Sequence, residues 1–415
     1  MKNNNKLNLL FISIAFPPKS DPECLQTAKY FKYLVKDKNL NIDVVTSEDK
    51  TLFMPIDKNL KKYVKGYRQI IKVSFFENKY INFLIRKINP FALNYPDSKF
   101  LFYKKYKSVI KQLKMKPDII YSRSFPLSST LMAYYVQKEL QVPWVLHLSD
   151  PWTLSPIHKL GDAKEWNDNM ERKCFNKATI LSFTSKKTIE LYSQKYPKYK
   201  NKMIFFPNVF DLDDKIDNPY TIQSKIKIVY TGGLIDNRSP QYIFNVIKKL
   251  YNEYPEIISN FKFIFAGDLD RKNKILFKQN IPFVEHIGLL SFKESLKLQQ
   301  SADLLLVIDT PFQNNKNAIF FPSKLLDYML IQRKILALTN KNSTTWDIVN
   351  NKLGNCYEHN DVDGIVQYLI TTWKAWKNKD KKHFYNKELD ISFSANKNAT
   401  KLSKLFQNIE LDNNI

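Results

Sequence analysis

Short apolar runs alternate with amphipathic stretches along most of the chain. Several runs, such as IIYS and WVLHL, are apolar at consecutive positions, which is typical of strands covered by helices on both faces. The predicted strands of the first half are residues 7–13, 41–47, 72–76, 117–123, 144–150, 178–185 and 202–208. After a polar stretch at 208–225, further strands are predicted at 226–232, 261–267, 303–309 and 334–339. Two such arrays predict an α/β protein of two Rossmann-like, doubly wound domains facing a cleft.

The amphipathic stretches carry helix signals. Ser239-Pro240 precedes apolar residues at helical spacing over 243–251, and Ser291 with Glu294 forms the pattern of a capping box. A further helix is predicted at 396–409. The expected organisation is therefore a first domain at 1–210, a second at 226–385, and a C-terminal tail at 386–415.

Composition narrows the class of protein. Of the 415 residues, 44% are hydrophobic and 14% aromatic, which supplies packed cores and excludes a disordered chain. Three scattered cysteines argue against a disulfide framework or a zinc cluster and favour a reducing, cytosolic setting. The apolar start is interpreted as a buried strand rather than a signal peptide, and no run approaches the ~20 residues that span a bilayer. We expect a soluble protein, at most peripheral to a membrane.

Positive charge is concentrated in one segment. The chain has 65 Lys and Arg against 40 Asp and Glu, a net charge of +25. Residues 58–116 hold 16 of the basic residues and two acids, which is +14, interleaved with Phe and Tyr. This composition suits a face that lies on anionic lipid headgroups. A solvated lysine-rich surface is the open alternative, and no nucleic-acid partner is expected because no nucleic-acid-binding signature accompanies the charge.

The segment IKIVYTGGLIDNRSP at 226–240 is the first candidate site. A buried strand ends in Gly232-Gly233, and a loop with Arg238 leads into a capped helix. Adjacent glycines allow the backbone to approach a ligand, and a helix N-terminus with an arginine favours phosphate. The alternative is an ordinary strand-to-helix turn that binds no ligand.

The segment FFPSKLLDYML at 320–330 is the second candidate site. Pro322 is predicted as the first helical residue, which places Ser323 and Lys324 on the first turn, where phosphate is favourable. Asp327 follows on the same face, at a reach suited to a ribose diol. Together with the glycine turn, this pattern describes a cradle for a nucleoside diphosphate.

Polar residues also end strands of the first half. His147 and Asp150 lie at the end of a buried strand, where doubly wound folds bind ligands, so either could act as a general base or position a ligand. A packed core histidine and a turn-capping aspartate are the alternatives. Arg123 ends another strand and could hold an anionic group of a ligand or simply form an ion pair.

In order along the chain, these motifs resemble glycosyltransferases of the GT-B fold, in the family-4-like branch known from bacterial surface polysaccharides. The donor-domain segments are TGG with Arg238, FAG at 265–267, HIGLLS at 286–291, SADLLLVID at 301–309 and PSKLLDYM at 322–329. The first half is similar in FPP at 16–18, KPDIIYSR at 116–123, VPWVLHLSDPW at 142–152 and FPN at 206–208. The resemblance implies that the second domain binds a nucleotide-sugar, the first binds the acceptor, and the tail returns to the first domain.

The resemblance also implies roles for single residues. Arg238 and Lys324 would neutralise the diphosphate leaving group in place of a metal, so neither a metal nor a cofactor is expected. Asp327 matches the second acid of the family's acid pair, but the first position is Ile319, so the pair is incomplete. His286 would lie near the donor, and the loop with Lys19 and Glu23 would face the acceptor.

The expected function is transfer of a hexose from a nucleoside diphosphate-sugar, UDP being the expected nucleotide, to a glycan acceptor. The resemblance and the basic segment imply a lipid-linked acceptor, a place at the cytoplasmic face of the membrane and a role in polysaccharide biosynthesis. A nucleotide-sugar 2-epimerase of the same fold stays an alternative, because it needs no acceptor. A non-catalytic glycan- or lipid-binding scaffold is the other, suggested by Ile319.

Overall fold

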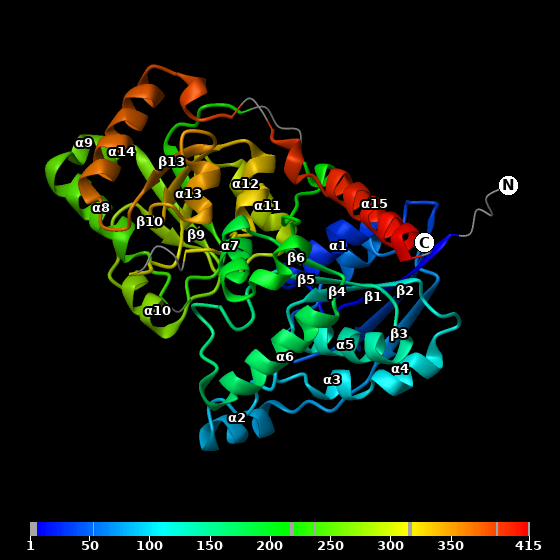
Figure 1. Ribbon diagram of the computed structural model, residues 1–415. Coiled ribbons are helices and arrows are strands. Elements are labelled where there is room, and N and C mark those ends of the chain that lie inside the picture. Colours follow the sequence, from blue (N-terminus) through cyan, green and yellow to red (C-terminus); the bar gives the residue numbers. More distant parts are fainter. Residues whose placement is uncertain are drawn as a thin grey trace. The chain divides into compact units, whose positions relative to one another are not determined.

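The computed structural model describes residues 6–52, 54–215, 220–235, 237–313, 318–386 and 389–413. The chain divides into two compact units (Figure 1). Unit 1 comprises Met1–Asp211 and Ser392–Ile415, and unit 2 comprises Leu212–Ile391. Each unit is described separately below.

Unit 1 is built on a parallel seven-stranded sheet in the order β3-β2-β1-β4-β5-β6-β7. Its strands are β1 (Leu7–Ile12), β2 (Leu40–Ser47), β3 (Gln69–Val73), β4 (Ile119–Ser124), β5 (Trp144–Leu148), β6 (Ile180–Phe183) and β7 (Met203–Phe205). All seven predicted strands are present. The third begins three residues earlier than predicted, because Ile70 and Ile71 pair with β2, whereas Phe75 and Phe76 lie beyond the strand.

Helices cover both faces of this sheet. The helices of unit 1 are α1 (Pro22–Leu34), α2 (Lys79–Ile88), α3 (Leu101–Lys104), α4 (Tyr106–Gln112), α5 (Ser128–Leu140), α6 (Lys164–Lys177), α7 (Lys186–Lys195) and α15 (Ala395–Asn413), and all of them except α2 bury side chains. Alternate residues of β1 enter different cores: Leu10 and Ile12 pack with α5, whereas Leu9 and Phe11 pack with α1. This alternation explains why the strand is apolar at consecutive positions.

The C-terminal helix α15 packs on unit 1, beside α1 (Figure 1). The Phe406 ring lies 5.4 Å from the Tyr121 ring of β4, and both side chains are buried. The Ser403 hydroxyl donates a hydrogen bond to Asp37, which follows α1. Unit 1 is therefore completed by residues that follow unit 2 in the chain.

Unit 2 repeats the arrangement with six parallel strands in the order β10-β9-β8-β11-β12-β13. They are β8 (Ile226–Thr231), β9 (Phe261–Ala266), β10 (Val284–His286), β11 (Leu304–Ile308), β12 (Lys334–Leu338) and β13 (Gly354–Tyr357). The four predicted strands are present. The edge strands β10 and β13 were not predicted, because they are short and carry too few apolar residues to form a pattern.

The helices of unit 2 also cover both faces of its sheet. They are α8 (Gln241–Glu253), α9 (Pro255–Ile258), α10 (Arg271–Phe277), α11 (Phe292–Gln300), α12 (Lys324–Ile331), α13 (Thr344–Val349) and α14 (Val362–Lys377). One core joins β8 to α8 and α14, and the other joins β11 to α12. The predicted capping box of Ser291 and Glu294 is present at the start of α11. The prediction of two doubly wound α/β domains is confirmed.

Both sheets reverse their strand order next to the first strand of their unit, between β1 and β4 and between β8 and β11. Doubly wound sheets bind ligands at such a reversal, outside the carboxyl ends of the strands. The two reversals therefore locate one candidate region in each unit.

Candidate functional site

The turn after β8 is tightly packed against the turn after β9. Gly232 donates a backbone hydrogen bond to Ala266 (2.8 Å) and has φ +119°. Gly267 has φ +137°, and a Cβ there would lie 2.2 Å from the Gly232 carbonyl oxygen. Both positions therefore require glycine, and they leave bare backbone at the edge of the sheet.

The ammonium group of Lys324 lies against this bare backbone. A Cβ on Gly232 would approach the Lys324 Nζ to 3.0 Å, and the Nζ lies 3.7 Å from the centre of the Tyr230 ring. The Nζ is shielded from water and has no hydrogen-bond partner in the described part of the chain. Burial, with Arg238 nearby, lowers the pKa of Lys324 well below its ordinary value. Asp309 partly opposes this shift, but no anion forms a hydrogen bond with the Nζ within the described ranges.

Arg238 adds a second cation. Its Nη1 donates to the Gly233 carbonyl at 3.3 Å, and the Tyr230 hydroxyl donates to the same oxygen at 3.0 Å. The Arg238 Nε is also buried and finds no partner among the described residues. Tyr230 was not singled out from the sequence, although its place in the strand before the glycines could have indicated it.

The other residues predicted for this site lie around the same turns. Ser323 is the N-cap of α12, so the helix begins at Lys324 and not at Pro322 as predicted. The Ser323 side chain makes no capping hydrogen bond. The first turn is closed by Leu325 N donating to the Pro322 carbonyl, and Asp327 lies on that turn. Ile319, at the missing acid position, is buried.

His286 ends β10, and its Nε2 lies 2.9 Å from the Gly267 carbonyl. Its contact is with the turn that Gly267 forms. The structure thus brings together Gly232, Gly233, Arg238 and Lys324, while His286 supports the neighbouring turn.

In unit 1, Arg123 and Glu23 form one cluster. The Arg123 Nε donates to Glu23 at 2.9 Å, and the Ser149 hydroxyl donates to the other oxygen of Glu23. Burial raises the pKa of Glu23 to about 7, although Arg123 opposes the shift. Arg123 is fully buried, packs over the Tyr30 ring and has an unpartnered Nη2 within the described ranges. The two predicted acceptor residues are therefore in contact, at the carboxyl edge of the sheet.

Lys19 and His147 are both fully buried. The Lys19 Nζ donates to the Ser47 carbonyl at 3.4 Å, and burial lowers its pKa to about 8. His147 Nδ1 lies 2.9 Å from the Ser182 hydroxyl on β6. Burial, with Arg123 nearby, keeps the pKa of His147 well below its ordinary value, so the ring is neutral. Neither side chain is presented at the surface of unit 1.

Asp150, unlike Lys19 and His147, is not fully buried. It follows β5, is partly exposed, and has no hydrogen-bond or ion-pair partner among the described residues. Burial alone raises the pKa of its carboxyl to about 6. A carboxylate with a raised pKa and no partner is the form that a general base takes.

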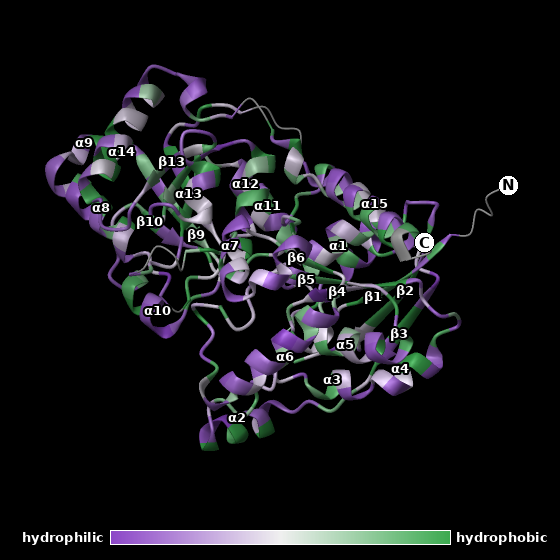
Figure 2. Ribbon diagram, viewed as in Figure 1, coloured by the Kyte–Doolittle hydropathy of each residue, from purple (hydrophilic) through white to green (hydrophobic). Residues whose placement is uncertain are grey.

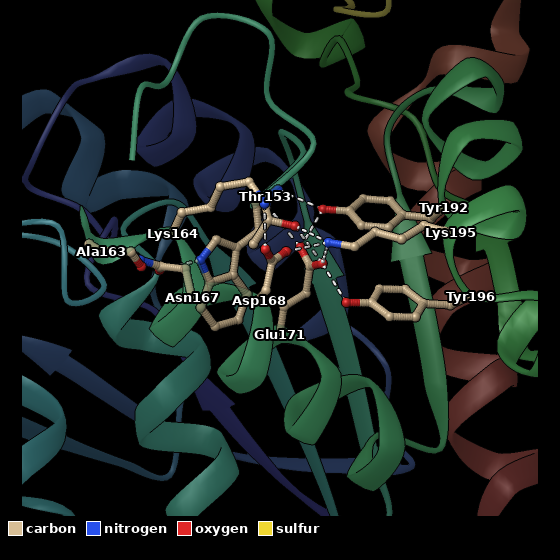
Figure 3. A network of polar contacts seen from close by, with 10 residues as sticks. Thr153, Ala163, Lys164, Asn167, Asp168, Glu171, Tyr192, Lys195 and Tyr196 are labelled. Atoms are coloured by element: carbon tan, nitrogen blue, oxygen red, sulfur yellow. Dashed lines mark hydrogen bonds and ion pairs between the residues drawn. The ribbon is translucent and has the colours of Figure 1, made fainter. Parts of the chain in front are cut away.

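A polar network fixes the loop that follows Asp150 (Figure 3). Glu171 of α6 is fully buried and accepts hydrogen bonds from the Thr153 backbone (2.9 Å), the Thr153 hydroxyl (2.7 Å) and Tyr192 of α7 (2.7 Å). Lys195 forms an ion pair with Glu171 at 2.9 Å. The loop is thereby held three residues after Asp150, a support that sequence spacing did not indicate.

Beside this network a hollow of about 1030 Å³ is lined by Tyr95, Trp166 and Tyr196 together with charged residues of α6. Its polar groups Asp168 and Lys195 are paired with each other. The network is therefore a structural support rather than a site with unmet charge.

Two further findings concern metal binding and membrane spans. The described residues contain no group of three or more His, Cys, Asp or Glu placed to hold a metal ion. None of their helices combines the length and the apolar character needed to cross a bilayer.

Comparison with known proteins extends this description. No protein-family model matches the chain, and no curated protein is significantly similar in sequence. Among solved structures, the N-terminal domain of Candida albicans trehalose-6-phosphate phosphatase is 13% identical with a TM-score of 0.67, covering 97% of both chains. Sucrose-phosphate synthase of Thermosynechococcus elongatus is 11% identical with a TM-score of 0.65, covering 97% of this chain and 99% of the other.

The fold is that of the GT-B glycosyltransferases. A structure of S. aureus TarM with UDP shares this fold at 11% identity and a TM-score of 0.60, covering 97% of this chain and 99% of the other. A Listeria monocytogenes protein described as a UDP-N-acetylglucosamine 2-epimerase is 12% identical with a TM-score of 0.55, covering 96% and 95%. Neighbours of this one fold thus include both a protein named as a sucrose-phosphate synthase and one described as a 2-epimerase.

Proposed function

We propose that this chain is a glycosyltransferase that moves a hexose from a nucleoside diphosphate-sugar to a glycan acceptor. One observation carries the proposal: Lys324 and Arg238 present two cations, with unmet hydrogen-bonding atoms, to the glycine turn at the strand reversal of unit 2. A diphosphate is the anion whose charge and size suit two cations beside free backbone. UDP is the expected nucleotide, since neighbours of the same fold include structures with UDP.

The proposed chemistry depends on charge stabilisation. As the sugar leaves, negative charge grows on the diphosphate, and Lys324 and Arg238 neutralise it in a site shielded from water. This role requires no metal, so we propose a metal-independent transferase of the family-4-like branch. Asp327 would contact the donor, although Ile319 stands at the first position of the acid pair of that branch. Ser323 would contact the phosphate through its backbone N–H, whereas Pro322, which lacks an N–H, would border the site.

We propose that unit 1 binds the acceptor. Asp150 is the proposed base that orients or deprotonates the acceptor hydroxyl, because it combines partial exposure with a pKa raised to about 6. The pair of Arg123 and Glu23 supports the same edge of the sheet, and His147 and Lys19 are assigned to the packing beneath it.

The acceptor is proposed to be lipid-linked. The segment 58–116 carries a net charge of +14, which suits the headgroups of an anionic membrane. We therefore place the enzyme at the cytoplasmic face of a membrane, as a peripheral protein of cell-surface polysaccharide synthesis.

A nucleotide-sugar 2-epimerase is the second candidate, favoured by the Listeria neighbour of the same fold. An epimerase would convert a UDP-sugar in the absence of any acceptor, whereas a transferase requires one. Incubating a UDP-sugar alone and identifying the sugar that is still attached to UDP afterwards therefore separates the two activities.

A thermal-shift screen with UDP, GDP, ADP, CMP and dTDP tests the donor site. A nucleotide that binds only the folded state adds about 2.7 kcal/mol at 100 times its Kd, which raises Tm by a few degrees. We expect UDP to stabilise the wild type and to have no effect on Lys324→Ala. Lys341→Ala, which removes an exposed lysine of the same unit, should behave as the wild type.

If no nucleotide shifts the melting temperature of well-folded protein, the donor-site proposal is wrong. The scaffold interpretation would then be the better one. A shift that survives Lys324→Ala would move the nucleotide site elsewhere in the chain.

A further inference from the structure

Helix α2 of unit 1 is a complete amphipathic helix with no buried residue. It follows β3 and is N-capped by Asn78, whose side-chain oxygen accepts hydrogen bonds from the backbone of Tyr80 (2.9 Å) and Ile81 (3.2 Å). The cap gives the helix a defined start without help from a core. The start of α2 is therefore fixed by its cap, although none of its residues is buried in unit 1.

The apolar side chains of α2 gather along one side of the helix. Tyr80, Leu84 and Ile88 follow each other at intervals of four residues, and Ile81 and Ile85 lie beside them. The opposite side carries Lys79, Asn82, Arg86 and Lys87, with Phe83 among them. Figure 2 shows α2 with both hydrophobic and hydrophilic residues.

This apolar side faces solvent. The exposed fractions of Tyr80, Leu84 and Ile88 are 69%, 56% and 88%. A helix that covers a core buries such a stripe, as α8 does with Ile243, Val246, Ile247 and Leu250. An exposed stripe bordered by charge indicates a surface that a partner covers.

The charge of α2 limits what that partner is. The helix carries Lys79, Arg86 and Lys87, and residues 78–96 contain no acid. Beside the exposed Phe76, a hollow of about 730 Å³ is lined in part by Lys104 and Lys105. The apolar side chains of α2 lie next to positively charged ones. A partner that complements them has an apolar interior and a negatively charged surface.

A second copy of the chain fits this surface poorly. A twofold contact through the stripe would supply no anion for Lys79, Arg86 and Lys87, because residues 78–96 contain no acid, and it would gather six like charges around one apolar interface. An anionic bilayer instead satisfies both sides of the helix, because acyl chains receive the apolar stripe and headgroups receive the cations.

We propose that α2 lies in the headgroup region of an anionic lipid bilayer, with Tyr80, Leu84 and Ile88 toward the acyl chains. This inference deepens the proposed function and rests on it, because a lipid-linked acceptor would give the membrane contact its purpose. Its physical basis is the exposed apolar stripe together with the positive charge of α2. The proposal predicts that apolar area and positive charge both contribute to membrane binding.

Co-sedimentation of the full chain with vesicles tests the proposal. The probes are vesicles of phosphatidylcholine alone and of phosphatidylcholine with phosphatidylglycerol. The wild type should sediment with the anionic vesicles only. Leu84→Ser/Ile88→Ser should weaken binding by on the order of tenfold for each side chain. Lys79→Gln/Arg86→Gln/Lys87→Gln should weaken it by about fivefold for each charge.

Matched variants control for general losses of apolar surface and charge. Ile275→Ser/Leu411→Ser removes two side chains that are 57% and 60% exposed on other helices. Lys248→Gln/Lys272→Gln/Lys341→Gln removes three exposed lysines of unit 2. Both should bind anionic vesicles as the wild type does.

Several results would overturn the proposal. They are a wild type that does not sediment with anionic vesicles, serine variants of α2 that bind as well as their controls, and a dimer in light scattering that Leu84→Ser/Ile88→Ser abolishes. Thermal shift with UDP on the same proteins keeps the two proposals distinguishable. Vesicle binding without a UDP shift contradicts the proposed function and leaves the α2 proposal standing, whereas a UDP shift without vesicle binding does the reverse.

Discussion

In unit 1 the guanidinium of Arg123 lies 2.9 Å from Glu23, whereas in unit 2 the ammonium of Lys324 has no hydrogen-bond partner among the described residues. Both cations lie near the strand reversal of a sheet with the same order. A buried cation with a partner is part of the structure, and removing it leaves a buried anion. A shielded cation without one is costly, and a bound anion would lower that cost. The comparison therefore separates a cation that is paired within the protein from one that we propose to bind a substrate.

Arg123→Met should produce the largest change. It leaves Glu23 buried without its cation, and breaking a buried pair costs about 3–5 kcal/mol. Urea unfolding followed by hydrogen-exchange mass spectrometry can measure the free energy of β4 and β5 separately from β8. Glu23→Gln/Arg123→Met should recover much of the loss. A single variant as stable as the wild type would contradict the structural role assigned to Arg123.

Lys324→Met should lower the activity without lowering the stability. No hydrogen-bond partner among the described residues is left behind, so Tm should stay unchanged or rise, while kcat for sugar transfer should fall by about 10²–10³, the usual cost of losing one group that stabilises developing charge. Turnover and thermal unfolding of one preparation provide both values, with Lys341→Met as the control. A variant that loses stability as well as turnover would mean that Lys324 is structural, like Arg123.

Asp150→Asn tests the carboxylate of unit 1 in the same way. A carboxyl whose folded pKa is raised to about 6 binds protons that the unfolded chain has released, so the wild type loses stability as pH rises from about 4 to 6. The asparagine variant lacks this loss and should be more stable by roughly 1–3 kcal/mol at neutral pH. Transfer activity should fall. Equal stability of both proteins across this pH range would show that Asp150 has a partner.

The smallest predicted effect is a proton taken up with the nucleotide. Burial and Arg238 lower the pKa of Lys324, and a bound diphosphate should raise it again, so UDP affinity should fall with rising pH by at most about tenfold per pH unit. Calorimetry at pH 8 in buffers of different ionisation enthalpy measures the proton directly. Lys324→Met should abolish the uptake. Uptake that persists in this variant would assign the proton to another group.

Most of the fold could be predicted because central parallel strands are apolar on both faces. The edge strands β10 and β13 span only three and four residues and carry too few apolar residues to form a pattern. The apolar stripe of α2 would have predicted a buried face, since periodicity reports a helix with two sides but not what covers either side.

The candidate site was predictable in part. Gly232, Arg238 and Lys324 could be grouped because both motifs flank strands of one sheet. The contact of Glu23 with Arg123 joins residues a hundred positions apart, and nothing in their spacing indicates it. His147 and Asp150 were equivalent candidates in sequence, and only the burial of one and the exposure of the other distinguishes them.

The place of α15 has a consequence for the synthesis of the chain. Unit 1 lacks its covering helix until the ribosome has translated all of unit 2, residues 212–391, which takes about 10–40 s at common elongation rates. During that interval the patch beneath Leu402 and Phe406 is uncovered, while unit 2 can already fold. Unit 2 begins later in the chain than unit 1, yet it is the first of the two that can be completed.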